Sequence, residues 1–378
     1  MPAIKRKILI LTGDAGLGHR SAAEALQKAF EHRFADQCET SIQNPLNHAD
    51  IPDFIRQSQS DYDEIVKAIP ELYRLGYDIS DSKLPVSLME DGFTMLLLDV
   101  MRKMLAEFKP DLILTTYPIY PAPLSSLQES DHLDLPVIAT VTDLVTVHHV
   151  WFHEALTLLT VPTDIVRQRA LEAGLHSDQL KITGIPVDPE IHHLKDVSVK
   201  ELRNDLGWDP DTTTLLVVGS PRVVALMDIL REIDARDETF QFALVAGGND
   251  ELYEDFQSTS WEHPASVYNF VDFMPRLMRA SDLIICKAGG LIVTESLASE
   301  LPLMLVHVLP GQERGNVGYV VEHGAGALCE SASKAAETLG RWLAEDGKAL
   351  TQMSQKAAQA GRADAALEIA RIAWDLLD

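Results

Sequence analysis

The sequence has no apolar run long enough to span a membrane. A bilayer requires about 20 consecutive apolar residues, whereas the longest apolar runs, such as residues 301–310, have the length of buried strands. The apolar run near the N-terminus is too short for a signal peptide, because it breaks at Thr12 and Gly13. These absences predict a cytoplasmic protein.

Cysteine and positive charge are both scarce. Cys38, Cys286 and Cys329 are too few and too scattered for a disulfide framework or a zinc site. The 378 residues include 57 acidic against 32 basic side chains, a formal net charge of −25. This charge argues against a nucleic-acid partner, whose phosphates it would repel. It also disfavours a whole surface lying on an anionic membrane, although composition leaves a local basic patch open.

Short apolar runs alternate with helix-like stretches along the whole chain. The length, with 46% hydrophobic and 24% charged residues, fits two globular domains. Apolar runs bounded by Gly, Pro and Asp are typical of strands covered on both faces by helices, so the alternation predicts an α/β fold with parallel sheets. The expected strands are residues 7–12, 112–117, 137–143, 156–162, 181–186, 214–219, 242–247, 267–273, 283–286 and 303–307.

A polar stretch without a strand, near residues 187–200, separates two similar halves and is expected to be a linker. We expect an N-terminal domain over residues 1–190 and a second over residues 200–355, facing each other across a cleft. Ligands of α/β folds bind at the carboxyl ends of the strands. The C-terminal residues 356–378 are expected to form a helix, for which packing back on the N-terminal domain is one option.

Residues 52–108 contain two helix-like runs and no expected strand, and we interpret them as a helical insertion. Tyr62, Ile65, Ile69 and Leu72 recur at three- and four-residue spacing, which indicates an apolar stripe on a helix. The favoured interpretation is that this stripe packs on the domain's own core. The alternative is a flap that receives an apolar substrate.

Residues 11–26 read LTGDAGLGHRSAAEAL and nearly match a phosphate-binding P-loop. Gly13 and Gly18 hold the two glycine positions, but His19 and Arg20 stand where that loop has Lys and a hydroxyl residue. The start of the helix still attracts anions through its backbone N–H groups, and His19 adds a group that takes a proton near neutral pH. The turn therefore predicts a histidine at the mouth of a cleft, with a structural strand cap as the alternative.

A second cluster lies between residues 286 and 326. A strand ends at Cys286, Gly289 and Gly290 make a tight turn, and Glu295 follows early in the next helix. Such a helix start suits a phosphate, and a carboxylate one turn on can accept two ribose hydroxyls. Adjacent amide and carboxylate groups in the loop 311–313 suit a ligand rich in hydroxyls. Glu295 alone also fits an acid that complements the helix dipole.

Three segments in the same order resemble the diacylglycerol glycosyltransferases of glycosyltransferase family 28, which include monogalactosyldiacylglycerol synthases and processive diacylglycerol glucosyltransferases. They are GDAGLGHRSAAEAL, residues 13–26; the stretch from VTDL to GIPVDPE, residues 141–190; and KAGG to GAG, residues 287–326. The resemblance covers most of the chain except residues 35–105 and detail near 219–235. It implies a GT-B fold of two Rossmann-like domains, with an acceptor lipid in the first and a nucleotide sugar in the second.

The resemblance also implies an activity. A hexose would move from UDP-hexose, either galactose or glucose, to the free hydroxyl of 1,2-diacylglycerol with inversion, without a metal or other cofactor. The enzyme would be a cytoplasmic, peripherally membrane-associated protein of glycolipid biosynthesis, with the helical insertion as a possible lipid region. Two alternatives stay open: another lipid-linked or soluble acceptor, and a non-catalytic protein that binds a sugar nucleotide.

The resemblance also implies roles for individual residues. His19 would help to position the acceptor or the phosphate, and Asp143 would be the base or the group that orients it; which of the two is the base stays open. The implied donor-binding residues are Gly219 and Ser220 in a first phosphate loop, Phe270 and Val271 whose backbone would meet uracil, Gly289 and Gly290 at the diphosphate, Glu295 at the ribose, and Gly311, Gln312 and Glu313 at the sugar; the implied acceptor residues are Gly16, Gly18, Trp151 and Phe152.

The sequence departs from the family pattern in several places. Pro221 follows Gly219 and Ser220 where relatives have further glycines, and proline removes a backbone donor. Ile292 replaces a common Thr. Residues 51–110 hold 11 acidic and 7 basic side chains, so docking would rest on apolar residues such as Met95, Leu96 and Leu97, or the acceptor would be more soluble. A metal site formed by His148, His149 and His153 is disfavoured because no carboxylate or cysteine ligand is near.

Overall fold

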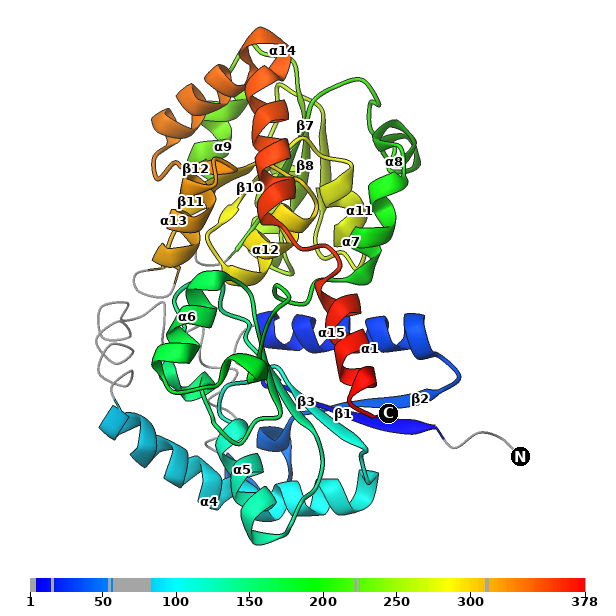
Figure 1. Ribbon diagram of the computed structural model, residues 1–378. Coiled ribbons are helices and arrows are strands. Elements are labelled where there is room, and N and C mark those ends of the chain that lie inside the picture. The colour runs from blue at the N-terminus through cyan, green and yellow to red at the C-terminus, as the bar shows by residue number, and fades with distance from the viewer. Residues whose placement is uncertain are drawn as a thin grey trace. The chain divides into compact units, whose positions relative to one another are not determined.

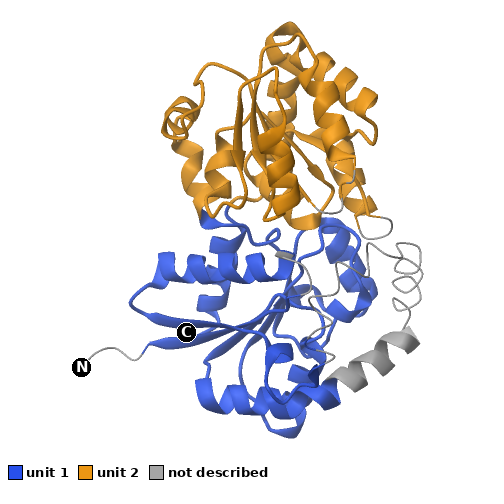
Figure 2. Cartoon of the chain, turned by 180° about the vertical axis from the view of Figure 1, so that it is seen from behind, with its two compact units in different colours: residues 1–189, 310–312, 364–378 blue, residues 190–309, 313–363 orange. Residues whose placement is uncertain are grey.

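The structure is a computed structural model that describes residues 5–14, 17–53, 56, 83–220, 223, 225–309 and 313–377. The chain divides into two compact units (Figure 2). Unit 1 comprises Met1–Pro189, Pro310–Gln312 and Asp364–Asp378, and unit 2 comprises Glu190–Leu309 and Glu313–Ala363. Each unit builds a parallel six-stranded sheet with helices between its strands (Figure 1).

The sheet of unit 1 has the strand order β2-β1-β3-β4-β5-β6. Ile8 of β1 pairs with Thr40 of β2 on one side and with Leu112 of β3 on the other. The strands are β1 Arg6–Leu11, β2 Cys38–Gln43, β3 Leu112–Thr115, β4 Val137–Thr140, β5 Leu158–Val161 and β6 Leu180–Ile182; the helices are α1 Leu17–Phe34, α4 Lys83–Phe108, α5 Pro121–Ser130, α6 Asp164–Glu172 and α15 Ala365–Asp375, with short 3-10 helices η1 Pro45–Asn47, η2 His149–Trp151 and η3 Ser177–Gln179.

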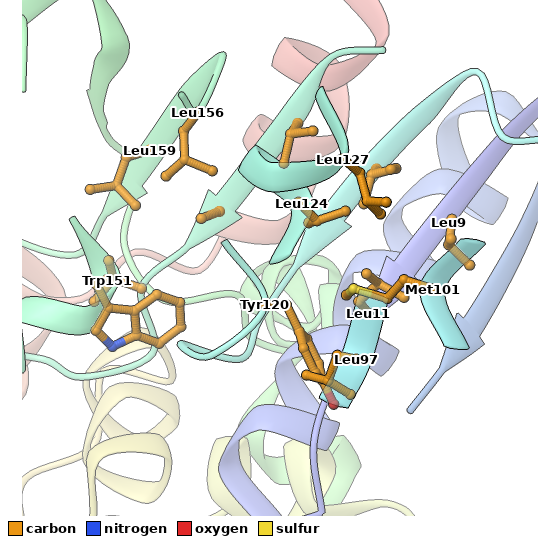
Figure 3. Packing of buried hydrophobic residues seen from close by; sticks show 14 of the residues in the cluster. Leu9, Leu11, Leu97, Met101, Tyr120, Leu124, Leu127, Trp151, Leu156 and Leu159 are labelled. Atoms are coloured by element: carbon orange, nitrogen blue, oxygen red, sulfur yellow. The ribbon is translucent and has the colours of Figure 1, made fainter. Parts of the chain in front are cut away.

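Strand β1 shows how the sequence builds a core on each face of this sheet. Successive side chains of a strand point to opposite faces. Leu9 and Leu11 therefore join one buried cluster, with residues of α4 and α5 (Figure 3). Ile8 and Ile10 join another, with residues of α1 and α15. A continuous apolar run thus forms a strand because both of its faces are covered.

The sheet of unit 2 has the order β12-β11-β10-β7-β8-β9. Its largest helix, α14, changes direction at Ala344–Gly347, where Glu345, Asp346 and Gly347 have positive φ. The strands are β7 Thr214–Val218, β8 Gln241–Val245, β9 Ala265–Tyr268, β10 Leu283–Lys287, β11 Leu303–His307 and β12 Gly326–Leu328; the helices are α7 Pro189–His193, η4 Leu194–Asp196, α8 Val199–Asp205, α9 Leu226–Asp234, α10 Asp250–Ser258, α11 Met274–Arg279, α12 Gly290–Ala298, α13 Arg314–Glu322 and α14 Ala332–Ala360.

Helix α4 occupies the C-terminal part of the expected helical insertion. Leu97 is fully buried and Leu96 packs against the same core cluster, whereas Met95 is 75% exposed. The expectation that Leu97 serves membrane docking is therefore wrong, because its side chain fills the core beside β1. The apolar stripe of Tyr62, Ile65, Ile69 and Leu72 lies outside the described residues. Among the helices that the structure describes, none combines the length and apolar character that crossing a bilayer requires.

Candidate functional site

In unit 1, the candidate site forms where the carboxyl ends of β1, β3 and β4 meet the start of α1. His19 lies in the first turn of α1, and its Nδ1 is 2.8 Å from the carbonyl oxygen of Thr116 and 2.8 Å from Oγ1 of Thr142. A carbonyl only accepts hydrogen bonds, so Nδ1 carries the proton and donates it. In the neutral ring, Nε2 then holds the free lone pair and is the nitrogen able to act as a base.

Asp143 supplies a negative charge beside this ring. The indole Nε1 of the fully buried Trp151 donates to Oδ2 of Asp143 at 3.0 Å, and the rings of His19 and Trp151 are 6.4 Å apart. Desolvation lowers the pKa of His19 below its ordinary value, while the charge of Asp143 acts in the opposite direction. The result is a neutral imidazole with a carboxylate placed to stabilise it once it takes a proton.

The glycine at position 13 makes room for an aromatic side chain. A Cβ added to Gly13 would lie 2.6 Å from the ring of Tyr117, which is closer than atoms can approach without strain. Tyr117 in turn meets the ring of His19 edge to face, with centroids 4.9 Å apart. In this structure the first P-loop-like glycine therefore helps to fix the imidazole through Tyr117.

Asp14 braces the same turn. Its Oδ1 accepts from Nε and Nη2 of Arg20 at 2.9 and 2.6 Å, and its Oδ2 accepts from Asn44 at 2.8 Å and Asn47 at 2.7 Å. Burial disfavours the charged carboxylate, but these hydrogen bonds outweigh burial and lower the pKa of Asp14. Asp14 and Arg20 therefore hold the start of α1, and neither was among the site residues predicted from sequence.

The histidines near η2 have separate surroundings. His148 accepts the backbone N–H of Val150 at 3.2 Å, and His149 packs edge to face on the half-buried Phe152, with centroids 5.8 Å apart. Desolvation lowers the pKa of His153. Within the described part of the chain, no three His, Cys, Asp or Glu side chains are grouped as metal ligands. Gly18 lies in α1, and Gly16 is outside the described residues.

In unit 2, the predicted donor-binding residues gather at one edge of the sheet. Gly219 follows β7, Phe270 comes two residues after β9, and Gly289 follows β10. The carboxyl ends of parallel strands share an edge, where α/β folds bind ligands. The structure therefore brings these three segments together, as the strand assignment from sequence predicted. Gly311 and Gln312 lie outside the described residues.

The turn between β10 and α12 is the centre of this edge. Gly289 caps α12, whose first residue is Gly290, and the first N–H groups of a helix have no partner within it. Asn316 of α13 donates to the carbonyl of Ala288 at 2.9 Å and so ties the turn to the next helix. Glu295 follows one turn into α12 and is half-buried. This arrangement suits an anion at the helix start.

Glu313 lies beside this turn in a closed environment. It is 6% exposed, its Oε1 accepts from Nζ of Lys287 at 2.7 Å, and its Oε2 accepts from the backbone N–H of Leu309 at 2.8 Å. Lys287 is the last residue of β10, two residues before the glycine cap. Lys287 was not among the residues predicted from sequence, although a cation directly before a glycine turn is a signal that could have indicated it.

The segment after β9 exposes an aromatic ring. Phe270 is 72% exposed, whereas Val271 is buried. Asn269 donates from Nδ2 to Asp250 at 2.8 Å, and its buried Oδ1 accepts no hydrogen bond from any residue that the structure describes. At the carboxyl end of β7, a Cβ added to Gly219 would lie 3.1 Å from the carbonyl oxygen of Val245, the last residue of β8. Glycine therefore allows the backbones of the two strands to approach closely here. Ser220 follows Gly219 at the same edge.

Comparison with solved structures identifies the fold. MurG of Acinetobacter baumannii matches with a TM-score of 0.64 at 14% identity, covering 98% of this chain and 100% of that chain. A UDP-GlcNAc 2-epimerase from Neisseria meningitidis, bound to UDP-GlcNAc, matches with a TM-score of 0.61 at 16% identity, covering 98% and 100%. Anabaena Alr3699/HepE in complex with UDP-glucose gives 0.56 at 15%, covering 98% and 99%. The predicted GT-B class, with two Rossmann-like sheets, is confirmed.

Comparison of sequences identifies the family. Residues 19–187 match the family model for monogalactosyldiacylglycerol (MGDG) synthase, and residues 213–375 match that for the glycosyltransferase family 28 C-terminal domain. A probable chloroplastic monogalactosyldiacylglycerol synthase of Glycine max is 35% identical over 376 residues, covering 96% of this chain and 70% of that protein. Monogalactosyldiacylglycerol synthase 1 of Arabidopsis thaliana, also chloroplastic, is 32% identical over 379 residues, covering 96% and 70%. The chain therefore belongs to the monogalactosyldiacylglycerol synthase family of glycosyltransferases, as its three motifs predicted.

Proposed function

We propose that this protein transfers a hexose from UDP-hexose to the free hydroxyl of 1,2-diacylglycerol, with inversion and without a metal ion. The observation that carries the proposal is His19: in a member of this family, its Nδ1 is committed to the Thr116 carbonyl and leaves Nε2 as a base. The names of the relatives favour galactose as the hexose.

His19 acts as the base in this proposal. The acceptor oxygen attacks the anomeric carbon, its proton passes to Nε2, and the bond from that carbon to the UDP oxygen breaks. Attack from the side opposite UDP inverts the anomeric carbon. The imidazolium that forms is stabilised by the Thr116 carbonyl and by the charge of Asp143. General base catalysis of this kind contributes about 10²–10⁴-fold to a rate.

The donor is held by the sheet edge of unit 2 in this proposal. The turn at Gly289 and Gly290 presents backbone N–H groups to the diphosphate. The partial positive charge at this end of α12 stabilises the negative charge on UDP as it leaves. Glu295 accepts the ribose hydroxyls, and the backbone at Phe270 meets uracil. The loop that contains Gln312 binds the sugar hydroxyls.

A bilayer is the source of the acceptor, so we also propose that the enzyme binds peripherally at a membrane surface. Met95 on α4 offers an exposed apolar side chain for this contact. The sequence-based candidate for a lipid region is residues 52–108, of which residues 54–55 and 57–82 lie outside the described residues.

The test is transfer by the purified protein. It is incubated with radiolabelled UDP-galactose or UDP-glucose and with vesicles of phosphatidylcholine containing diacylglycerol, with and without EDTA. We expect a labelled galactolipid whose formation EDTA does not reduce, and NMR of the product to show the inverted anomer. Transfer only to other lipid-linked or soluble acceptors would show that diacylglycerol is not the acceptor. UDP binding without transfer to any acceptor would identify a non-catalytic protein.

A further inference from the structure

Lys287 and Glu313 form an ion pair at the mouth of the α12 turn. The distance between Lys287 Nζ and Glu313 Oε1 is 2.7 Å, and the two side chains are 24% and 8% exposed. The ammonium lies beside the helix cap, because a Cβ built on Gly289 would be only 2.5 Å from Nζ. The pair therefore belongs to the turn that we propose binds the diphosphate.

The electrostatics of this position favour an anion. The N-terminus of a helix carries a partial positive charge, so a cation placed there is unfavourable on its own. Glu313 offsets this cost, and its second oxygen is fixed by the N–H of Leu309. An ammonium has three donors, and the bond to Glu313 uses one of them. The others can serve a phosphate at the same turn.

Glu313 is fixed in its position by the protein. Both oxygens accept hydrogen bonds from within the chain, and the residue is 6% exposed. Loss of either bond would leave a less well paired charge in a buried setting, which is costly. The geometry therefore favours a role that acts through Lys287.

We propose that Lys287 binds the diphosphate of the donor and neutralises the charge that develops on it as the sugar leaves, and that Glu313 is the positioning residue that holds Lys287 in place. This proposal rests on the proposed function and adds a side-chain cation to the backbone N–H groups of α12. As the glycosidic bond breaks, its electron pair moves to the β-phosphate oxygen, and Lys287 stabilises that oxygen without transferring a proton.

The experiment compares UDP with uridine, which lacks the phosphates, by calorimetry on the full chain. For Lys287→Met we expect UDP affinity to fall about 10- to 100-fold, the range of a charge-assisted hydrogen bond, and uridine affinity to stay unchanged. Lys287→Arg should recover part of the UDP affinity because it keeps the charge. Lys334→Met, at an exposed lysine of α14, is the matched control and should change neither.

Glu313→Gln tests the positioning role. The amide oxygen can still accept from Leu309, but the anchor for the ammonium is lost. We expect UDP, which carries no hexose, to bind at least tenfold more weakly to Glu313→Gln, because the diphosphate contact of Lys287 is weakened. Loss of a direct sugar contact would instead raise KM for UDP-hexose and leave UDP affinity unchanged.

The outcomes separate this proposal from the proposed function. Unchanged UDP affinity in Lys287→Met, or equal losses of UDP and uridine affinity, would overturn the role of Lys287 while leaving the transferase assignment intact. Unchanged UDP affinity together with a raised KM for UDP-hexose in Glu313→Gln would assign Glu313 to the sugar. Absence of UDP binding by the unmodified protein would overturn both proposals.

Discussion

At the scale of single residues, His19 has two polar partners 2.8 Å from the same ring nitrogen, Thr116 and Thr142. We predict that His19→Ala lowers hexose transfer by about 10²–10⁴-fold, because the proton of the acceptor then has no base. UDP affinity should be unchanged, since the residues proposed to bind the donor follow other strands. His192→Ala, at an exposed histidine of α7, is the control and should change neither transfer nor UDP affinity. If His19→Ala lowers UDP affinity as much as it lowers transfer, His19 contacts the phosphate instead.

The surroundings of His19 also predict the pH dependence. The ring has to be neutral to accept a proton, and desolvation lowers its pKa below 6.5. Transfer should therefore persist below pH 6.5 and be lost as the pH falls through the lowered pKa. Asp143→Asn removes a charge that raises this pKa, so the acid limb of the kcat–pH profile should move to lower pH. The maximal kcat at higher pH should also fall, because the imidazolium that forms is less stabilised. If Asp143→Asn abolishes hexose transfer while His19→Ala stays active, Asp143 is the base.

Gly13 gives a prediction about stability. Gly13→Ala forces a methyl group against the ring of Tyr117, and such overpacking costs about 1–3 kcal/mol. We expect a lower midpoint of thermal unfolding and reduced transfer, because Tyr117 supports His19. Gly318→Ala in α13, where an added Cβ meets nothing within 4 Å, is the control. An unchanged midpoint for Gly13→Ala would show that the ring shifts freely.

The sequence predicted single site residues better than their partners. His19 and Asp143 stand out because they follow expected strands in recognisable motifs. Thr116 and Thr142 lie 97 and 123 residues from His19 in sequence, so no local pattern reveals their contact with the imidazole. The pairing of Lys287 with Glu313 was equally hidden, since it depends on where α13 begins relative to β10.

At the scale of elements, each of the ten expected strands overlaps a strand of the structure, whereas β2 and β12 were not predicted. Both are edge strands. The sequence of β2, CETSIQ, is mostly polar, and most of the strand is only half-buried. Strand β12 has only three residues. Apolar runs identify strands that are covered on both faces, so edge strands with polar or very short sequences carry too little of that signal.

Helix α15 is the element whose contribution to stability is most direct. Ala370 is fully buried against the helix that carries His19, and Trp374 stacks on Phe34 at 4.2 Å. We predict that Ala370→Asp destabilises unit 1 by about 3–5 kcal/mol, because it buries an unpaired charge. Leu376→Asp, at a residue that is 41% exposed, should have little effect. Circular dichroism of thermal unfolding measures both, and equal midpoints would show that α15 contributes little.

At the scale of the whole molecule, fold and family carry different information. MurG, HepE and a UDP-GlcNAc 2-epimerase share this fold at 14–16% identity, and a fold alone does not select a reaction. The motifs at His19, Asp143 and Gly289 made the family recognisable from sequence, because they combine glycine turns with a fixed order along the chain. The helical region before α4 had no comparable motif, and its composition alone supported two interpretations.

The overall charge predicts how the protein meets a bilayer. With a net charge of −25, we expect binding to vesicles to decrease when anionic lipid replaces phosphatidylcholine and to recover as salt screens the repulsion. Flotation at low and high ionic strength measures this effect. Tighter binding to anionic vesicles would instead reveal a local basic patch.

The order in which the polypeptide is synthesised gives α15 a further consequence. Residues 364–377 close the hydrophobic face of α1, yet the whole of unit 2 is translated before them. The nascent chain therefore leaves Phe34 without the covering ring of Trp374 throughout the synthesis of unit 2, which makes this face a binding site for chaperones. A ribosome stalled before codon 364 would carry a complete second sheet beside an unfinished first one.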